Sequence, residues 1–120
     1  MTDRVALRGL RARGRHGVLA AERELGQAFL VDVVLGLDTS AAAEGDSLAY
    51  TVDYGVLADR VVAVVEGEPV NLIETLAQRI ADACLAEPVV DEVEVTVHKP
   101  AAPVPVPFED VSVTISRART

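Results

Sequence analysis

The sequence predicts an α+β domain in which two β-hairpins flank a pair of helices, in the order ββααββ. Apolar residues alternate with polar ones near both ends of the chain, which is the period of a strand with one buried face. Between these segments, apolar residues recur at helical spacing. The strands pair most simply as an antiparallel four-stranded sheet. The chain of 120 residues, half of them apolar, fits a single domain over residues 1–120.

Three of the four expected strands have a regular alternation. They span residues 27–38, 92–99 and 109–117, each with its apolar side chains on one face. The first strand, residues 3–13, changes phase at Gly9, which predicts a bulge or bend there. The helices are expected to cover one face of this sheet, and the other face carries polar side chains that suit water or a polar lumen.

Apolar stripes predict helices over residues 54–66 and 71–86. Asp53 is placed to cap the first of them. Asn71 and Glu74 have the spacing of an N-cap and an acidic N3 residue, so a capping box is one explanation for Glu74.

The connections are expected to lack regular helices and strands. Residues 39–50 are predicted to form a loop, and residues 100–107, with four prolines, an extended connection. Glu22 is expected in a loop between the first two strands. The sheet has exposed edges that must be paired or covered, and joining edges between subunits is one solution.

Composition and charge exclude several classes of function. The formal net charge of −8 and the four aromatic residues argue against nucleic acid or an anionic membrane as a partner. No apolar run approaches the roughly 20 residues of a membrane span, and the N-terminus has no signal-peptide pattern, which predicts a cytoplasmic protein. Cys84 is the only cysteine, and His16 and His98 are the only histidines, so no metal site is expected.

Each polar candidate has an ordinary structural explanation beside a chemical one. Lys99, the only lysine, continues the buried face of the strand 92–99, where an ammonium can transfer protons, although a surface lysine at a strand end is common. Taken alone, Glu22 is a solvated carboxylate and Tyr54 a packing residue. His16 is expected in a turn and His98 on the exposed face, while the side chain of Cys84 belongs to the core.

Four motifs together resemble the dihydroneopterin aldolase family of folate biosynthesis. They are HGVxxxE at residues 16–22, the pair DY at 53–54, LIET at 72–75 and HKPxAPxP at 98–105, within matching stretches that cover nearly the whole chain. The resemblance implies the tunnelling fold, in which four subunits close a barrel and two such rings stack as a homo-octamer.

The resemblance also implies an activity. The family cleaves 7,8-dihydroneopterin into 6-hydroxymethyl-7,8-dihydropterin and glycolaldehyde, a retro-aldol reaction that makes the enzyme an aldehyde-lyase. By this resemblance Lys99 and Tyr54 transfer protons, and Glu22 contacts the substrate side chain and assists catalysis. No cofactor is implied, because the C6=N5 imine of the substrate can itself accept the electron pair. Lys99 is expected to act as an acid–base group and not through a Schiff base.

The same resemblance implies how the pterin is bound. Glu74 would hold the guanidine-like edge of the ring by a two-point hydrogen bond. The backbones of Val52 and Ile73 would make further ring contacts. Val52 and Tyr54 would come from one subunit and the other site residues from its neighbour.

Two alternatives remain. A pterin epimerase of the same fold could use the same residues, because re-forming the carbon–carbon bond on the other face inverts C2′. A non-catalytic ligand-sensing module, such as a ferredoxin-like domain, would run βαββαβ, whereas this chain places its two long helices consecutively.

Overall fold

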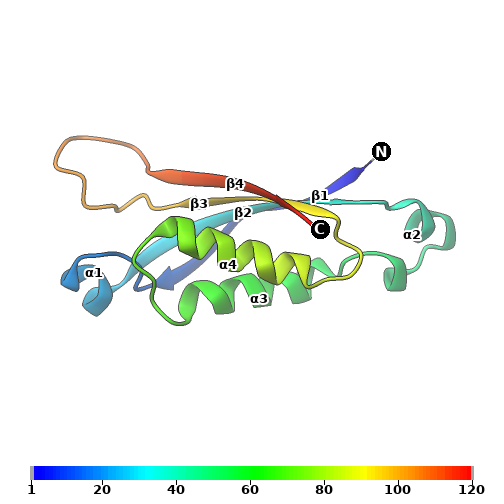
Figure 1. Cartoon of the computed structure of the whole chain (residues 1–120), viewed down its shortest axis with the longest axis horizontal. Coiled ribbons are helices and arrows are strands. Elements are labelled where there is room, and N and C mark those ends of the chain that lie inside the picture. Colours follow the sequence, from blue (N-terminus) through cyan, green and yellow to red (C-terminus); the bar gives the residue numbers. More distant parts are fainter. Residues whose placement is uncertain (1, 120) are drawn as a thin grey trace.

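The computed structural model describes residues 2–119, and its centre is a four-stranded antiparallel sheet in the order β1-β2-β3-β4. The strands are β1 (Asp3–Gly14), β2 (Gln27–Leu37), β3 (Glu92–His98) and β4 (Ser112–Ala118). The long helices, α3 (Tyr54–Glu66) and α4 (Ile73–Leu85), lie side by side on one face of the sheet (Figure 1). The predicted ββααββ order and the antiparallel pairing are confirmed.

The hydrophobic core lies between the sheet and these two helices. All five inward side chains of β2 are buried, from Phe29 to Leu37, as are the inward valines of β3. Helix α4 contributes Cys84 to the core, as predicted, and burial raises the pKa of its thiol to about 12. Except for the buried Ala12 of β1, the inward apolar residues of the edge strands β1 and β4 are only partly buried, so the helices cover the centre of the sheet better than its edges.

The predicted irregularity at Gly9 is confirmed. The pairing of β1 with β2 shifts register between Leu7 and Leu10, and Gly9 has a φ of 70°, which glycine adopts without strain. The Gly9 N–H donates to Asp32 Oδ1 of β2 at 2.7 Å. The bulge therefore brings a backbone donor to a carboxylate on the helix-free face.

Several predicted connections contain short helices. Glu22 lies in α1 (Ala20–Leu25), and the predicted loop 39–50 contains α2 (Ser40–Gly45) and a 3-10 helix, Leu48–Tyr50. The loop prediction was wrong because the alanine run of α2 favours a helix, and Ser47 Oγ accepts from Ala49 N–H at the start of the 3-10 turn.

The last strand and the proline-rich connection also differ from expectation. Strand β4 begins at Ser112 instead of residue 109, and directly before it the Val111 carbonyl accepts from Lys99 N–H at 2.7 Å. The connection is not uniformly extended, since Ala102 N–H turns back to the Lys99 carbonyl at 3.1 Å.

The two predicted helix caps have different outcomes. Asp53 caps α3, with its Oδ1 accepting from Val56 N–H at 3.2 Å. The predicted capping box of α4 was wrong: Leu72 is the N-cap, it makes no side-chain cap bond, and Glu74 is the second residue of the helix. Asn71 is unavailable as a cap because its Oδ1 accepts from the Arg23 guanidinium.

His16, which the sequence placed in a turn, lies in the connection before α1 and is fully buried. Its Nε2 bonds the Val65 carbonyl at 2.7 Å, and its Nδ1 accepts from Val70 N–H at 3.1 Å. Burial lowers the pKa of His16, which keeps the ring neutral. The ring ties the segment before α1 to the C-terminal end of α3.

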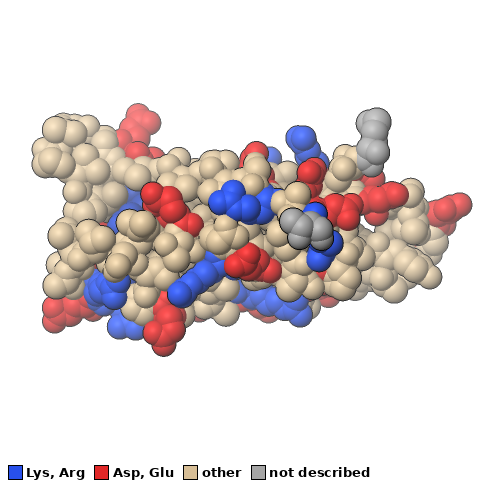
Figure 2. Space-filling view, in the orientation of Figure 1, with Lys and Arg blue, Asp and Glu red and all other residues tan. Residues whose placement is uncertain are grey.

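The molecule is elongated, with extents of 52 × 24 × 24 Å, and α1 and α2 lie at opposite ends (Figure 1). Figure 2 shows acidic and basic side chains interspersed over the described part of the face in view. Within residues 2–119, no helix combines the length and the apolar character needed to cross a membrane.

Candidate functional site

A cavity of about 500 Å³ lies at the end of the molecule that carries α1. Its walls come from α1 and the residues before it, the first turn of α4, and the loop that joins β3 to β4. Four of the predicted site residues line it: Glu22, Ile73, Glu74 and Lys99. Within residues 2–119, no three His, Cys, Asp or Glu side chains gather in a way that could hold a metal ion.

The central feature of this cavity is an ion pair between Lys99 and Glu22. Lys99 Nζ lies 2.5 Å from Glu22 Oε2, and each residue is only 9% exposed. Lys99 reaches this position because it follows the inward side chains of β3, as the alternation predicted. Burial raises the pKa of the Glu22 carboxyl, but the hydrogen bond and positive charge of Lys99 oppose it, and the net pKa lies below the ordinary value of 4.5.

Residues that the sequence did not single out hold Glu22 in place. Gln27 Nε2 donates to Glu22 Oε2 at 3.1 Å, and Leu19 N–H points to Oε1 at 3.4 Å. At Gly17 a Cβ would overlap the Glu22 carboxylate, so only glycine fits beside it. The sequence expectation of a solvated loop carboxylate was wrong, because α1 turns Glu22 inward onto Lys99. Gln27 gave no sequence signal beyond its place at the start of β2.

Glu74 lies in the first turn of α4, at the mouth of the cavity, and is exposed. Within residues 2–119 its carboxylate makes no hydrogen bond or ion pair with another side chain or backbone group. Ile73 is 8% exposed and its side chain packs into the core. Its backbone forms part of the first turn of α4, next to Glu74. The site therefore offers an unengaged carboxylate beside the buried Glu22–Lys99 pair.

The remaining predicted residues, Val52 and Tyr54, lie at the other end of the chain's fold. Tyr54 is the first residue of α3, and Val65, near the other end of the same helix, contacts His16 close to the cavity. About 16 Å of helix therefore separates Tyr54 from the cavity end of α3. Tyr54 is 62% exposed, whereas Val52 is 2% exposed and belongs to the core. One chain thus brings four of the predicted site residues together and holds the other two apart from them.

The sequence model of the dihydroneopterin aldolase family matches residues 5–116. The chain belongs to the dihydroneopterin aldolase family. A dihydroneopterin aldolase of Streptomyces coelicolor is 69% identical over 117 residues, covering 98% of each chain. Among solved structures, an Escherichia coli dihydroneopterin aldolase in complex with neopterin has a TM-score of 0.87 at 29% identity, covering 97% of this chain and 99% of that one.

A dihydroneopterin aldolase from Burkholderia thailendensis, bound to guanine, has a TM-score of 0.79 at 27% identity, covering 99% of this chain and 93% of that one. These matches confirm the family that the four motifs indicated, and with it the tunnelling fold. Membership makes this chain an enzyme with dihydroneopterin aldolase activity in folate biosynthesis.

Proposed function

We propose that this enzyme cleaves 7,8-dihydroneopterin by acid–base catalysis, with Lys99 as the principal proton-transfer group. The observation that carries the proposal is the buried Lys99–Glu22 pair in the wall of a cavity whose mouth holds the unengaged carboxylate of Glu74. The complex of the Escherichia coli relative with neopterin supports a pterin as the ligand.

The reaction needs only protons to be moved. A base removes the proton of the 2′-hydroxyl, the C1′–C2′ bond breaks to release glycolaldehyde, and the electron pair flows toward the protonated C6=N5 imine. The resulting enamine takes a proton at C1′, and loss of the N5 proton then gives 6-hydroxymethyl-7,8-dihydropterin. Each general acid–base step typically contributes about 10²–10⁴-fold. Lys99, unlike an arginine, can both give and accept a proton in such a sequence.

Glu22 and Glu74 divide the recognition of the substrate between them in this proposal. Glu22 lies against Lys99 and would contact the polar side chain of the substrate. Glu74 would accept two hydrogen bonds from the guanidine-like edge of the pterin, a charge-assisted contact. The backbone of Ile73, one residue before Glu74, would contact the ring from the same helical turn.

The position of Tyr54 and Val52 completes the proposal. Because these residues lie far from the cavity of their own chain, they would complete the site of a neighbouring subunit. A repeated head-to-tail contact of this kind closes into a ring. We infer a homo-octamer of two stacked four-subunit rings, with one site at each junction between neighbours in a ring.

The test is incubation of the protein with dihydroneopterin while glycolaldehyde is measured. Wild type should release it, Lys99→Ala should lose most turnover, and Lys99→Arg should not restore it, because the guanidinium keeps the charge and the contact to Glu22 but does not release its proton. Restored turnover in Lys99→Arg would remove Lys99 from proton transfer. Borohydride added with substrate should trap no adduct, and an adduct on Lys99 would show covalent catalysis instead. Any dihydromonapterin formed in the same incubation measures epimerase activity.

A further inference from the structure

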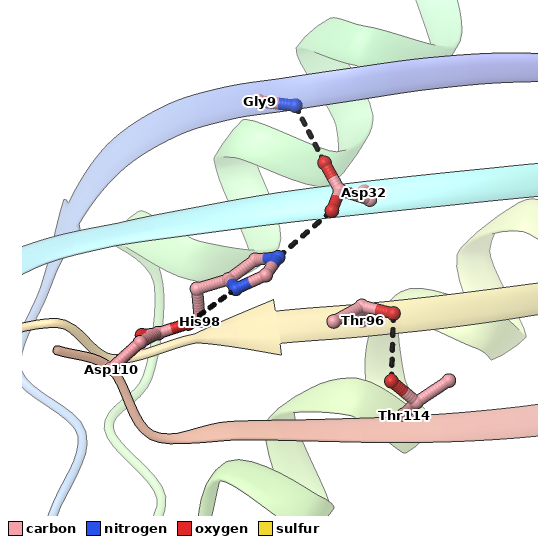
Figure 3. Close-up of polar contacts among 6 residues, drawn as sticks. All are labelled: Gly9, Asp32, Thr96, His98, Asp110 and Thr114. Atoms are coloured by element: carbon pink, nitrogen blue, oxygen red, sulfur yellow. Dashed lines mark hydrogen bonds and ion pairs between the residues drawn. The ribbon is translucent and has the colours of Figure 1, made fainter.

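A second cluster of titratable groups lies on the helix-free face of the sheet, away from the cavity. Figure 3 shows His98 between two carboxylates: Nδ1 lies 2.7 Å from Asp110 Oδ2, and Nε2 lies 2.8 Å from Asp32 Oδ2. The other oxygen of Asp32 accepts from the bulged Gly9 N–H at 2.7 Å. The cluster therefore joins β1, β2, the end of β3 and the loop before β4.

When Asp32 and Asp110 are both ionised, this geometry requires a proton on each ring nitrogen of His98. Two ionised carboxylates can only accept, so both nitrogens must donate, and the ring is the imidazolium. The contact with Asp110, followed by that with Asp32, raises the pKa of His98. The other charged groups around the cluster are Arg8 of β1, which acts on Asp32, and Glu109 of the loop. The sequence predicted only an exposed histidine at this position. The arrangement of His98 between Asp32 and Asp110, here called the clamp, arises from the tertiary fold.

The clamp is one residue away from Lys99. Side chains of successive strand residues point to opposite faces, so the His98 ring lies on the helix-free face while Lys99 points into the cavity. On the other side of the loop, Asp110 immediately precedes Val111, whose carbonyl accepts from Lys99 N–H at 2.7 Å. The loop between these two points carries Ala102, Pro103 and Val104 into the cavity wall.

We propose that His98 is a positioning residue for the reaction: its imidazolium clamps Asp110 to Asp32 and thereby fixes both Lys99 and the loop that walls the cavity. The proposal rests on the proposed function for its effect on turnover. A neutral His98 ring has one N–H and can hold only one of the two carboxylates. Raising the pH through the pKa of His98 therefore releases one side of the clamp, and Lys99 loses its fixed position relative to Glu22.

The chain offers a direct probe and a matched control. Because Lys99 is the only lysine, protein labelled with ¹³C-lysine gives one side-chain Cε resonance that reports the surroundings of Lys99 without substrate. The variant Asp110→Ala removes one side of the clamp. The control Thr96→Val removes the bond between Thr96 Oγ1 and Thr114 Oγ1, 2.8 Å, which joins β3 to β4 on the same face two residues away (Figure 3).

In Asp110→Ala the Lys99 resonance should move, and kcat for glycolaldehyde release should fall by about 10–100-fold with a smaller change in KM. Thr96→Val should resemble wild type in both, and Asp110→Asn, which keeps an acceptor, should recover part of the loss. In wild type the chemical shift of the Lys99 resonance should also change as the pH passes through the pKa of His98. That pKa can be followed directly, because the chain has only two histidine ring signals. In Asp110→Ala that change should move to lower pH.

An unchanged Lys99 resonance in folded Asp110→Ala overturns the proposal, as does an equal change in Thr96→Val. A moved resonance with unchanged kcat overturns the positioning role as well. Failure of the proposed function is a separate outcome. A wild-type protein that releases no glycolaldehyde would contradict the proposed function, whereas the Lys99 resonance, measured without substrate, still decides whether Asp110 positions Lys99.

Discussion

The two ends of this molecule are built for different tasks. At the α1 end, a carboxylate and an ammonium are buried together beside a cavity of about 500 Å³. At the α2 end, the tyrosine that the family resemblance assigns to proton transfer is 62% exposed. Burying a charged pair requires close mutual contact and further hydrogen bonds, and the α1 end provides both. This difference fits the proposal that each chain carries two parts of a site, which neighbouring subunits complete.

Apolar surface at the two ends supports the same interpretation. Val18 and Leu72 are exposed at the cavity, and Leu48, Tyr50 and Tyr54 are exposed at the opposite end. Large apolar side chains exposed together commonly mark an interaction surface. In the proposed ring, the contact between neighbouring subunits would bury both groups and bring Tyr54 to the cavity of its neighbour.

The largest expected effect is the return of activity when two inactive variants, one damaged at each end, are assembled into mixed oligomers. Tyr54→Ala and Glu74→Ala should each be nearly inactive, because each damages every junction. After denaturation and refolding together in equal amounts, about one junction in four receives an intact Tyr54 from one chain and an intact Glu74 from the other. About a quarter of wild-type glycolaldehyde release should therefore return.

The matched control mixes wild type with the double variant that carries both substitutions. With sites shared between chains, this mixture should also keep about a quarter of the activity of a pure wild-type sample, whereas sites within one chain would keep about half. If the single variants recover nothing together although mixed oligomers have formed, both residues act within one chain and the comparison fails.

A smaller effect is expected from Glu74→Gln at the cavity end. The change keeps the shape of the side chain but removes its charge, so binding of 6-hydroxymethyl-7,8-dihydropterin, measured by calorimetry, should weaken by roughly tenfold. The melting temperature should stay near that of wild type, because the Glu74 carboxylate holds no partner within residues 2–119. Asp82→Asn, which alters the carboxylate that Gln78 contacts later in α4, should leave binding unchanged. Unaltered binding with a lower melting temperature would return Glu74 to a purely structural role.

The smallest effect concerns the start of α3 at the other end. Asp53→Ala removes the side-chain acceptor of Val56 N–H, and the free energy of unfolding in urea should fall by about 1 kcal/mol. Asn71→Ala removes no cap from α4 and should cost less, because only an exposed contact with Arg23 is lost. A larger loss at Asn71 than at Asp53 would reverse the assignment of the two helix starts.

The four strands and the two long helices follow from local periodicity, and the sequence was sufficient for them, although not for the short helices α1 and α2. Helix α3 begins and ends where predicted, at residues 54 and 66. The alternation along β3 also placed Lys99 on the buried side, which is the most useful prediction for the chemistry. Such patterns depend on which face of a single element meets the core, so neighbouring residues contain the information. The family motifs then supplied the roles that periodicity cannot supply.

Tertiary structure decided how the polar groups are paired. Local patterns alone indicated a solvated Glu22, a turn residue at His16 and a capping box as one explanation for Glu74, whereas Glu22 and His16 are buried and Leu72 is the N-cap of α4. His16 bonds a carbonyl 49 residues away, and His98 bonds a carboxylate 66 residues away. A polar side chain is buried or solvated according to the partners that the folded chain brings to it, and those partners follow no local period. The cavity exists for the same reason, because α1, α4 and the loop after β3 meet only once the sheet has formed.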